Sequence, residues 1–279
     1  MLENTFCHMP GIGSKTERRL WSAGILSWQA ACERCADVLS PARADLITHH
    51  CRESMERLAD EDARYFHDRL PANEQWRLFP QFRNSVAYLD IETTGLGPPH
   101  DYITTLALYD GASVRHYIHG ENLDDFGDDI SDYRLVVTYN GKTFDVPFIR
   151  SCLGLRMEQA HIDLRYVLHS LGYGGGLKGC ERQLGLARGD LEGIDGYFAV
   201  LLWHDYLKNR NQGALETLLA YNVQDTVNLE TLMVLAYNMK VKETGFARSH
   251  GLPMPAQPEN PFEADARTVQ RIKRQYGLY

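Results

Sequence analysis

Long hydrophobic runs are missing from this sequence. No stretch approaches the roughly eighteen consecutive apolar residues that a membrane-spanning helix needs. The N-terminal segment MLENTFCHMPGIGSK also lacks the basic-then-apolar order of a signal peptide. We therefore expect a cytoplasmic protein that does not associate with membranes.

Cysteine is also sparse, with six residues in a chain of 279. This density is too low for a disulfide scaffold, so we expect reduced thiols. Cys32 and Cys35 form a C-x-x-C pair, but its spacing departs from zinc-finger patterns and it falls within an expected helix. Whether the cysteines and histidines between residues 7 and 51 bind a metal stays open; the others in this range are Cys7, His8, His49, His50 and Cys51.

Positive charge does not predominate, because 29 Lys and Arg residues face 37 Asp and Glu residues, for a net charge of −8. This balance argues against a protein that coats nucleic acid through positive charge. It does not exclude a nuclease that holds divalent cations between carboxylates. The Gly-rich segment 172–185 lacks the P-loop pattern G-x-x-x-x-G-K-[ST], and no G-x-S-x-G motif of a serine hydrolase occurs.

The order of residue patterns predicts an α/β fold with a helical N-terminal appendage. Residues 1–80 read as helical, with Ser27 as one N-cap and Ser40-Pro41 opening a longer helix that runs to Pro71. Short β-branched and aromatic segments follow, and Asp110-Gly111 is typical of a hairpin turn between two of them. Strands are expected at 85–91, 102–109, 113–120 and 134–140, and a long helix at 213–242. We expect domain limits at 1–80, 81–245 and 246–279, the last a Pro-rich linker and a short basic helix whose docking stays undecided.

Two carboxylates interrupt the first expected strand, in YLDIETTGL at 88–96. Because residues i and i+2 of a strand share a face, Asp90 and Glu92 would project together while Leu89 and Ile91 face the core. Two like charges at this spacing repel unless a cation lies between them. An isolated D-x-E more often marks the polar end of a strand, so this pair alone does not establish a metal site.

Three further residues lie downstream in a suitable order. Asp145 lies in the first turn of a helix expected near Phe144, where an acidic residue is favourable in any case. Tyr221 and Asp225 are four residues apart in a helical stretch and so project from one face. Taken alone, that pair is more often a solvated aspartate beside a half-buried tyrosine.

The series Asp90-x-Glu92, Asp145 in YNGKTFD, and Tyr221-x-x-x-Asp225 resembles the tyrosine subtype of the DEDD 3′–5′ exonucleases. The resemblance covers about residues 85–240. It implies a ribonuclease H-like fold with a central mixed sheet flanked by helices, and two Mg²⁺ or Mn²⁺ ions held by Asp90, Glu92, Asp145 and Asp225. Tyr221 would orient the attacking water. The segments HIDL, GLKGCERQLG and AYNVQDTVNL are similar to those of bacterial stand-alone ribonuclease H-like proteins.

The expected partner is nucleic acid, with a single-stranded or frayed DNA end favoured over RNA. MPGIGSKTERRLW resembles the hairpin and second helix of a helix-hairpin-helix, although too few residues precede it for a full first helix. We expect Asp163 to cap the helix after HIDL rather than to act as a fifth metal ligand. Aromatic side chains such as Phe144, Phe148 or Tyr173 are expected to stack on the unpaired end. Contacts with nucleic acid are expected from Gly11, Gly13, Lys15, Thr93, Asn140, Phe144 and Lys178.

Two other functions remain open at this point. One is a nucleic-acid-binding module without activity, against which the full acidic set and Tyr221 argue. The other is a structure-specific endonuclease, because one fold hosts several activities.

Overall fold

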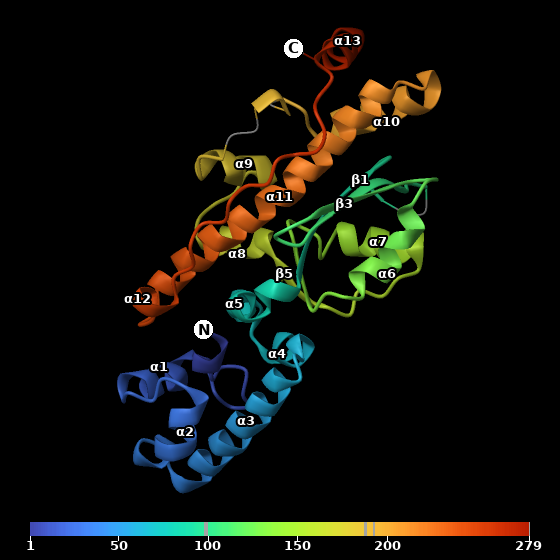
Figure 1. The fold of residues 1–279 in the computed structure, drawn as a ribbon. Coiled ribbons are helices and arrows are strands. Elements are labelled where there is room, and N and C mark those ends of the chain that lie inside the picture. Colours follow the sequence, from blue (N-terminus) through green and yellow to red (C-terminus); the bar gives the residue numbers. More distant parts are fainter. Residues whose placement is uncertain (98–99, 187–188, 192, 279) are drawn as a thin grey trace.

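A mixed five-stranded sheet forms the centre of the molecule in the computed structural model, which describes residues 1–97, 100–186, 189–191 and 193–278 (Figure 1). The strand order is β3-β2-β1-β4-β5. The central strand β1 is antiparallel to β2 and parallel to β4, which is parallel to β5. The α/β fold predicted from the sequence is thus confirmed. The strands are β1 (Val86–Thr93), β2 (Ile103–Tyr109), β3 (Val114–Ile118), β4 (Leu135–Thr138) and β5 (Ala160–Asp163).

The hairpin between β2 and β3 forms where Asp110-Gly111 predicted it. Gly111 has a φ of 91°, a left-handed value that favours glycine. The Asp110 carboxylate accepts hydrogen bonds from the backbone N–H groups of Ala112 and Ser113, at 2.9 and 2.7 Å. This side chain therefore closes the turn that sets the register of the two strands.

Alternate residues of β1 face two different helical layers. Leu89 and Ile91 pack in a core that includes Phe148 of α7, as the strand period predicted. Tyr88 faces the opposite side and shares a core with Val227 of α11. The first layer comprises η5 (Leu123–Asp125), α6 (Phe126–Ile130) and α7 (Asp145–Leu153); the second comprises α8 (Leu164–Ser170) and α11 (Gln212–Lys242).

Helix α11 is buried along most of its length because the chain covers it on both sides. The sheet lies on one side, and α9 and the C-terminal segment run along the other (Figure 1). The segment is docked: Asn260 Nδ2 donates to the Ala220 carbonyl at 2.8 Å, and the Asp265 N–H donates to Thr217 Oγ1 at 2.9 Å. The remaining elements of this half are α9 (Gly176–Gln183), η6 (Gly189–Leu191), α10 (Gly196–Asn209), α12 (Ala247–His250) and α13 (Ala266–Tyr276).

The N-terminal helices depart from the sequence prediction at two points. The single helix expected up to Leu70 is wrong, because the chain breaks at Glu61, which has a φ of 54°, and Asp62 caps a new helix. The C-x-x-C pair is also divided, since Cys32 lies in α2 and Cys35 in η2. The elements are η1 (Leu2–Asn4), α1 (Ser14–Ser22), α2 (Trp28–Arg34), η2 (Cys35–Asp37), α3 (Pro41–Ala59), α4 (Ala63–Arg69), η3 (Ala72–Leu78), α5 (Phe79–Phe82) and η4 (Arg83–Ser85).

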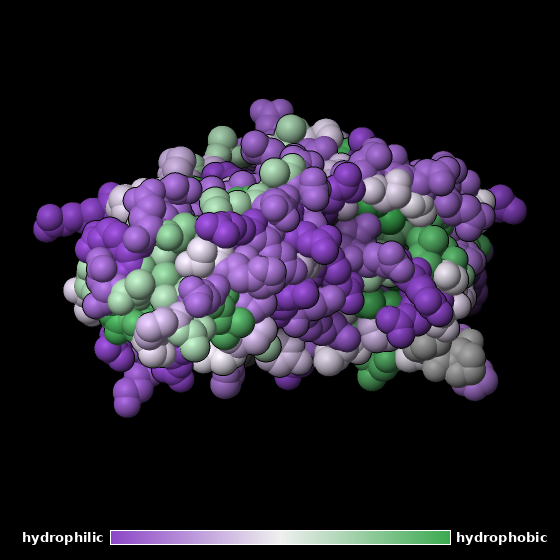
Figure 2. Space-filling view, turned by 90° about the horizontal axis from the view of Figure 1, so that it is seen from below, coloured by the Kyte–Doolittle hydropathy of each residue, from purple (hydrophilic) through white to green (hydrophobic). Residues whose placement is uncertain are grey.

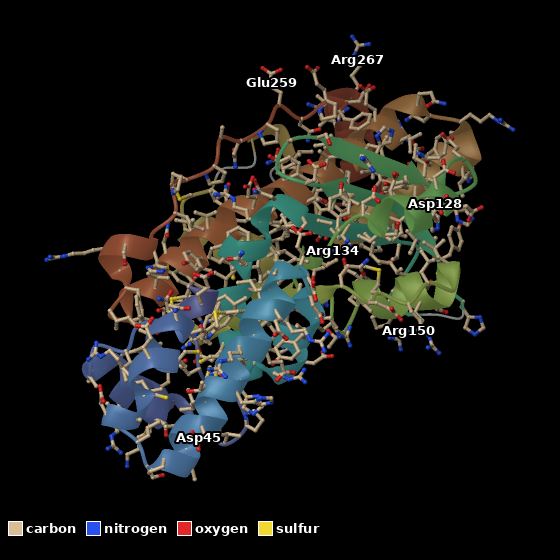
Figure 3. All side chains as sticks on the ribbon, turned by 60° about the horizontal axis from the view of Figure 1, so that its bottom comes forward. Asp45, Asp128, Arg134, Arg150, Glu259 and Arg267 are labelled. Carbon is tan, nitrogen blue, oxygen red and sulfur yellow. The ribbon has the colours of Figure 1, made fainter. Side chains whose placement is uncertain are left out.

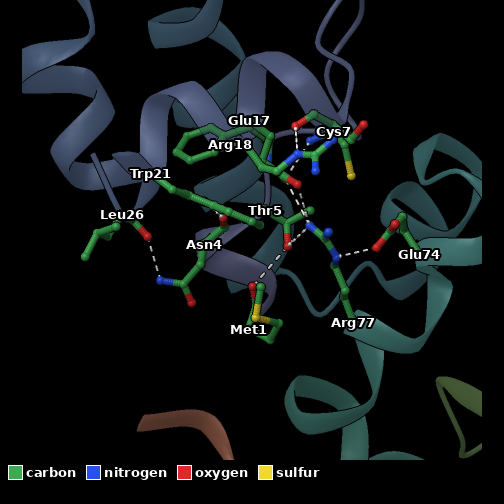
Figure 4. Close-up of polar contacts among 12 residues, drawn as sticks. Met1, Asn4, Thr5, Cys7, Glu17, Arg18, Trp21, Leu26, Glu74 and Arg77 are labelled. Carbon is green, nitrogen blue, oxygen red and sulfur yellow. Dashed lines mark hydrogen bonds and ion pairs between the residues drawn. The ribbon is translucent and has the colours of Figure 1, made fainter. Parts of the chain in front are cut away.

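A buried ion pair holds α1 against η3 (Figure 4). Arg77 Nη1 donates to both carboxylate oxygens of Glu17, at 2.9 and 3.0 Å, and both side chains are almost fully buried. The same carboxylate accepts the backbone N–H groups of Phe6 and Cys7. Glu17 thus ties the N-terminal turn, α1 and η3 together.

The face seen in Figure 2 is mainly hydrophilic, and its hydrophobic residues form small separate patches. None of the helices in the described residues is long and apolar enough to cross a membrane. The apolar residues of the N-terminal helices instead join one core with those of α11 and the sheet. The N-terminal helices are therefore packed on the sheet domain through buried side chains.

Candidate nuclease site

Three carboxylates meet at the C-terminal end of β1. Oxygen atoms of Asp90, Glu92 and Asp225 all lie within 4.8 Å of one another. Glu92 and Asp225 are buried and Asp90 is partly buried. Carboxylate groups this close and this shielded from water fit a hard divalent cation.

The local structure explains why these carboxylates meet. Asp90 and Glu92 share the α11 face of β1 with Tyr88, and Asp225 projects from α11 toward that face. The pairing with β2 is regular up to Glu92, and its register shifts between Glu92 and Thr93. The alternation of side chains along β1 and the packing of α11 on one face of that strand therefore bring the three carboxylates together.

Asp145 lies beside this group but outside its 4.8 Å limit. It begins α7 and is buried. Burial raises the pKa of its carboxyl well above the usual value, and the negative charge of Asp90 raises it further. The structure thus brings three of the four predicted acids together and places the fourth within the electrostatic reach of Asp90.

Tyr221 lies one turn before Asp225 on α11, and both side chains are 4% exposed. The alternative of a solvated aspartate beside a half-buried tyrosine is therefore wrong. Lys178 of α9 places Nζ 4.5 Å from the centre of the Tyr221 ring and donates to the Ile194 carbonyl. Lys178, expected to contact nucleic acid, is half-buried and packs against the tyrosine.

Sequence reasoning missed Asn222. This residue is fully buried, and its Nδ2 donates a hydrogen bond of 2.8 Å to Asp90 Oδ2. Its position next to Tyr221 was a possible signal, but neighbouring helix residues point in different directions, so the contact with β1 could not be inferred. Asn222 fixes one carboxylate oxygen of Asp90.

Asp163 organises the loop between β4 and α7. Its carboxylate accepts the backbone N–H groups of Asn140, Lys142 and Arg165, at 2.8, 3.1 and 3.0 Å. It also forms the N-cap of α8, which agrees with the expected capping role. The Asp163 carboxylate thus holds the backbone of the loop that leads to Asp145.

Asn140 and Gly141 in this loop are both constrained, Asn140 by its backbone conformation and Gly141 by the lack of space for a side chain. Asn140 has a φ of 68°. A Cβ at Gly141 would lie 2.2 Å from Thr138 Oγ1, which explains the glycine. The Asn140 side chain accepts the Thr143 hydroxyl at 2.7 Å. Asn140 therefore shapes the loop, and its expected contact with nucleic acid stays a prediction.

The other residues expected to contact nucleic acid near the site differ in accessibility. Thr93 is buried, and its hydroxyl donates to the Gly95 carbonyl at 2.6 Å. Phe144 and Tyr173 are half-buried. Phe148 is 1% exposed within the core, so the expectation that it stacks on an unpaired base is wrong.

The segment at 9–25, which resembles part of a helix-hairpin-helix, lies among the N-terminal helices, near the end at which β1 begins (Figure 1). Gly11 has a φ of 76°, Gly13 precedes the first turn of α1, and Lys15 is exposed. Only the 3₁₀ turn η1 precedes the hairpin, as the short N-terminus predicted. A turn and a second helix are therefore present, and their contact with nucleic acid stays a prediction.

In the part of the chain that the structure describes, none of the cysteines between residues 7 and 51 belongs to a group of three candidate ligands close enough to share a metal ion. Burial raises the pKa of the Cys51 thiol, and Cys7 has its pKa raised to about 12 in the same way. The candidate ligands of this region that do approach one another are His49, His50 and Glu53 on α3. These three lie on the surface of the helix and outside the carboxylate site.

Similarity to known proteins assigns the chain to a family. The chain is 27% identical over 195 residues to the uncharacterized protein YprB of Bacillus subtilis strain 168, covering 60% of this chain and 46% of YprB. It thus spans about half the length of that relative. A family B DNA polymerase from Pyrobaculum calidifontis shares 17% identity and a TM-score of 0.42 over 56% of this chain and 24% of the polymerase. Residues 87–237, which contain α7 and most of β1 and α11, match the RNase_H superfamily, and the chain belongs to that family.

Proposed function

We propose that this protein is a metal-dependent 3′–5′ exonuclease that hydrolyses single-stranded or frayed DNA, or RNA, to nucleoside 5′-monophosphates. The observation that carries the proposal is the approach of Asp90, Glu92 and Asp225 to within 4.8 Å, with Tyr221 one turn away on α11. Membership of the RNase_H superfamily supports a nuclease-type fold. The order of the four acids and the tyrosine supports the exonuclease activity.

The donor set fits two Mg²⁺ or Mn²⁺ ions, since it consists of carboxylate oxygens on rigid elements and needs no histidine or cysteine. Asp90, Glu92 and Asp225 would hold them, with Asp145 completing the set. Divalent cations bound here would supply activation of the attacking water and stabilisation of the leaving 3′ oxygen.

The protein residues supply orientation. Tyr221 would accept or donate a hydrogen bond that aligns the attacking water, because a phenol hydroxyl is a poor general base by itself. Asn222 holds the Asp90 carboxylate in one orientation through its 2.8 Å hydrogen bond. The buried position of Tyr221, Glu92 and Asp225 limits bulk water at the reacting bond.

A 5′-labelled single strand incubated with Mn²⁺ tests the proposal. We expect a ladder that shortens from the 3′ end, with nucleoside 5′-monophosphates as products and full inhibition by EDTA. Matched DNA and RNA strands establish the sugar preference. A single internal cut would indicate an endonuclease instead, and binding without cleavage would indicate a binding module.

Variants link the activity to the site. We expect Asp90→Asn and Asp225→Asn each to abolish cleavage, because they remove carboxylates that have no substitute in the group. Asp128→Asn is the matched control, since Asp128 is an exposed acid of α6 (Figure 3). Wild-type activity in Asp90→Asn would contradict the proposal.

A further inference from the structure

A cavity lies beside the C-terminal end of β5, between the N-terminal helices and the sheet domain. Its volume is about 340 Å³, near the lower end of the range of roughly 300–1,000 Å³ typical of small-molecule pockets. η3 forms one wall, β5 and α8 form another, and Lys142 comes from the loop that leads to Asp145. The lining residues are Ala72, Asn73, Gln75, Lys142, Ile162, Asp163, Tyr166, Val167 and Ser170.

One end of this cavity carries the ammonium group of Lys142. Lys142 Nζ donates to Gln75 Oε1 at 2.9 Å, and within the described ranges no carboxylate lies at ion-pair distance from it. Asp163 also lines the cavity, and its negative charge opposes the effect of burial on the Lys142 pKa, while its oxygens accept three backbone N–H groups. Gln75 is fixed in turn, because its Nε2 donates to the His67 carbonyl at 3.2 Å.

The remaining wall is apolar and has an aromatic side chain at its edge. Ile162 and Val167 are buried, whereas the Tyr166 ring is 52% exposed although it lines the cavity. An exposed ring beside an apolar wall offers a stacking surface for a planar group. Partial burial lowers the pKa of the Lys142 ammonium, so an anion placed there would relieve a desolvated charge.

We propose that this cavity binds one nucleoside monophosphate unit, with its base against Tyr166 and Val167 and its phosphate on Lys142. The unit is distinct from the nucleotide at the carboxylate site. Two sources share this chemistry: a free mononucleotide, and one nucleotide of a strand whose end lies at the carboxylates. The charge of Asp163, which lines the cavity, contributes to the raised pKa of Asp145, so the two sites lie close together.

Titration of the full chain with dAMP in EDTA tests the proposal without any hydrolysis. We expect one saturable site, and binding of deoxyadenosine at least about tenfold weaker because the phosphate contact is lost. Lys142→Met should weaken dAMP binding by a similar factor, and Ala72→Trp should abolish it by filling the cavity from an exposed position at the start of η3. Lys208→Met, which changes an exposed lysine of α10, should leave dAMP binding unchanged.

A short oligonucleotide in the same assay distinguishes the two sources of the bound nucleotide. Loss of oligonucleotide affinity in both Lys142→Met and Ala72→Trp identifies a nucleotide of the strand, and loss of dAMP binding alone identifies a free mononucleotide. No saturable dAMP binding by the wild type, or equal affinity for dAMP and deoxyadenosine, overturns the proposal. An Asp225→Asn variant that still binds dAMP separates this result from any failure of the proposed nuclease activity.

Discussion

The side-chain amide of Asn222 donates a 2.8 Å hydrogen bond to the carboxylate of Asp90, and thereby joins helix α11 to strand β1. The amide is fully buried, so this bond is shielded from competing water. Partners that orient a carboxylate ligand govern both the position of its oxygens and their affinity for a cation. Asn222 is therefore a positioning residue for the proposed metal site.

We expect Asn222→Leu to lower Mn²⁺ affinity or kcat/KM by roughly 10–100-fold while Asp90 remains in place. Mn²⁺ titration of cleavage, together with direct Mn²⁺ binding, measures the effect. Asn209→Leu is the control, since Asn209 Nδ2 makes a bond of the same kind and length to Asp205 outside the site. If both variants lose activity equally, Asn222 acts through stability alone.

Tyr221→Phe tests the role of the hydroxyl. We expect kcat to fall by roughly 100-fold or more, because the variant keeps the ring contact with Lys178 but loses the group that orients water. Cleavage of a labelled strand at saturating Mn²⁺ measures kcat. Tyr197→Phe, at a residue 59% exposed on α10, should be neutral, and an unchanged kcat in Tyr221→Phe would remove the tyrosine from the mechanism.

Gly11→Ala tests the hairpin before α1. We expect weaker binding of duplex or single-stranded DNA, because a side chain at a φ of 76° disturbs the backbone N–H groups offered to a phosphate. Gly24→Ala is a matched control: it has a φ of 78° in the same region and equal room for a Cβ, but lies after α1. Equal DNA affinity for both variants in a salt titration would show that the hairpin only packs.

The Glu17–Arg77 pair predicts a large stability effect. Glu17→Gln removes one of the two carboxylates that pair with the buried Arg77 and leaves Glu74, at 2.8 Å from Arg77 Nε, as the other, so we expect a cost of up to about 3–5 kcal/mol in the free energy of unfolding. Asp68→Asn, which breaks the half-exposed pair with Arg64, should cost less than about 1 kcal/mol. Urea unfolding measures both values. Arg77→Met should cost less in the Glu17→Gln background than in the wild type, and additive costs would contradict coupling.

The sequence predicted the elements whose signals are local. The alternation around Asp90 determined which face of β1 carries the acids, and Asp110-Gly111 marked the hairpin. Contacts between distant segments were not accessible in this way. Asn222 reaches β1 across 132 positions, and Arg77 reaches Glu17 across 60, because packing brings those residues together. The break at Glu61 was missed since no proline or glycine marks it.

Two histidines, the buried His8 and the half-buried His161, contribute to the pH dependence of stability. Burial lowers the pKa of His8 and of His161 to about 3, from an ordinary value of 6.5. Both are thus neutral in the folded protein at pH values where the unfolded chain is protonated. The unfolded state therefore binds more protons in this range. The contribution of these two histidines to the free energy of unfolding is fully present above about pH 6.5 and is lost as the pH drops toward 3.

Each histidine contributes a slope of roughly 1.4 kcal/mol per pH unit in this window. We expect urea unfolding at pH 7.5, 5.5 and 4.5 to show a falling free energy of unfolding. His8→Leu should lower the slope by up to roughly 1.4 kcal/mol per pH unit, because His8 packs between Trp28 and Phe66 and needs no charge there. His49→Leu, at an exposed position, should leave the slope unchanged. A wild-type slope retained in His8→Leu would mean that His8 is protonated in the folded protein.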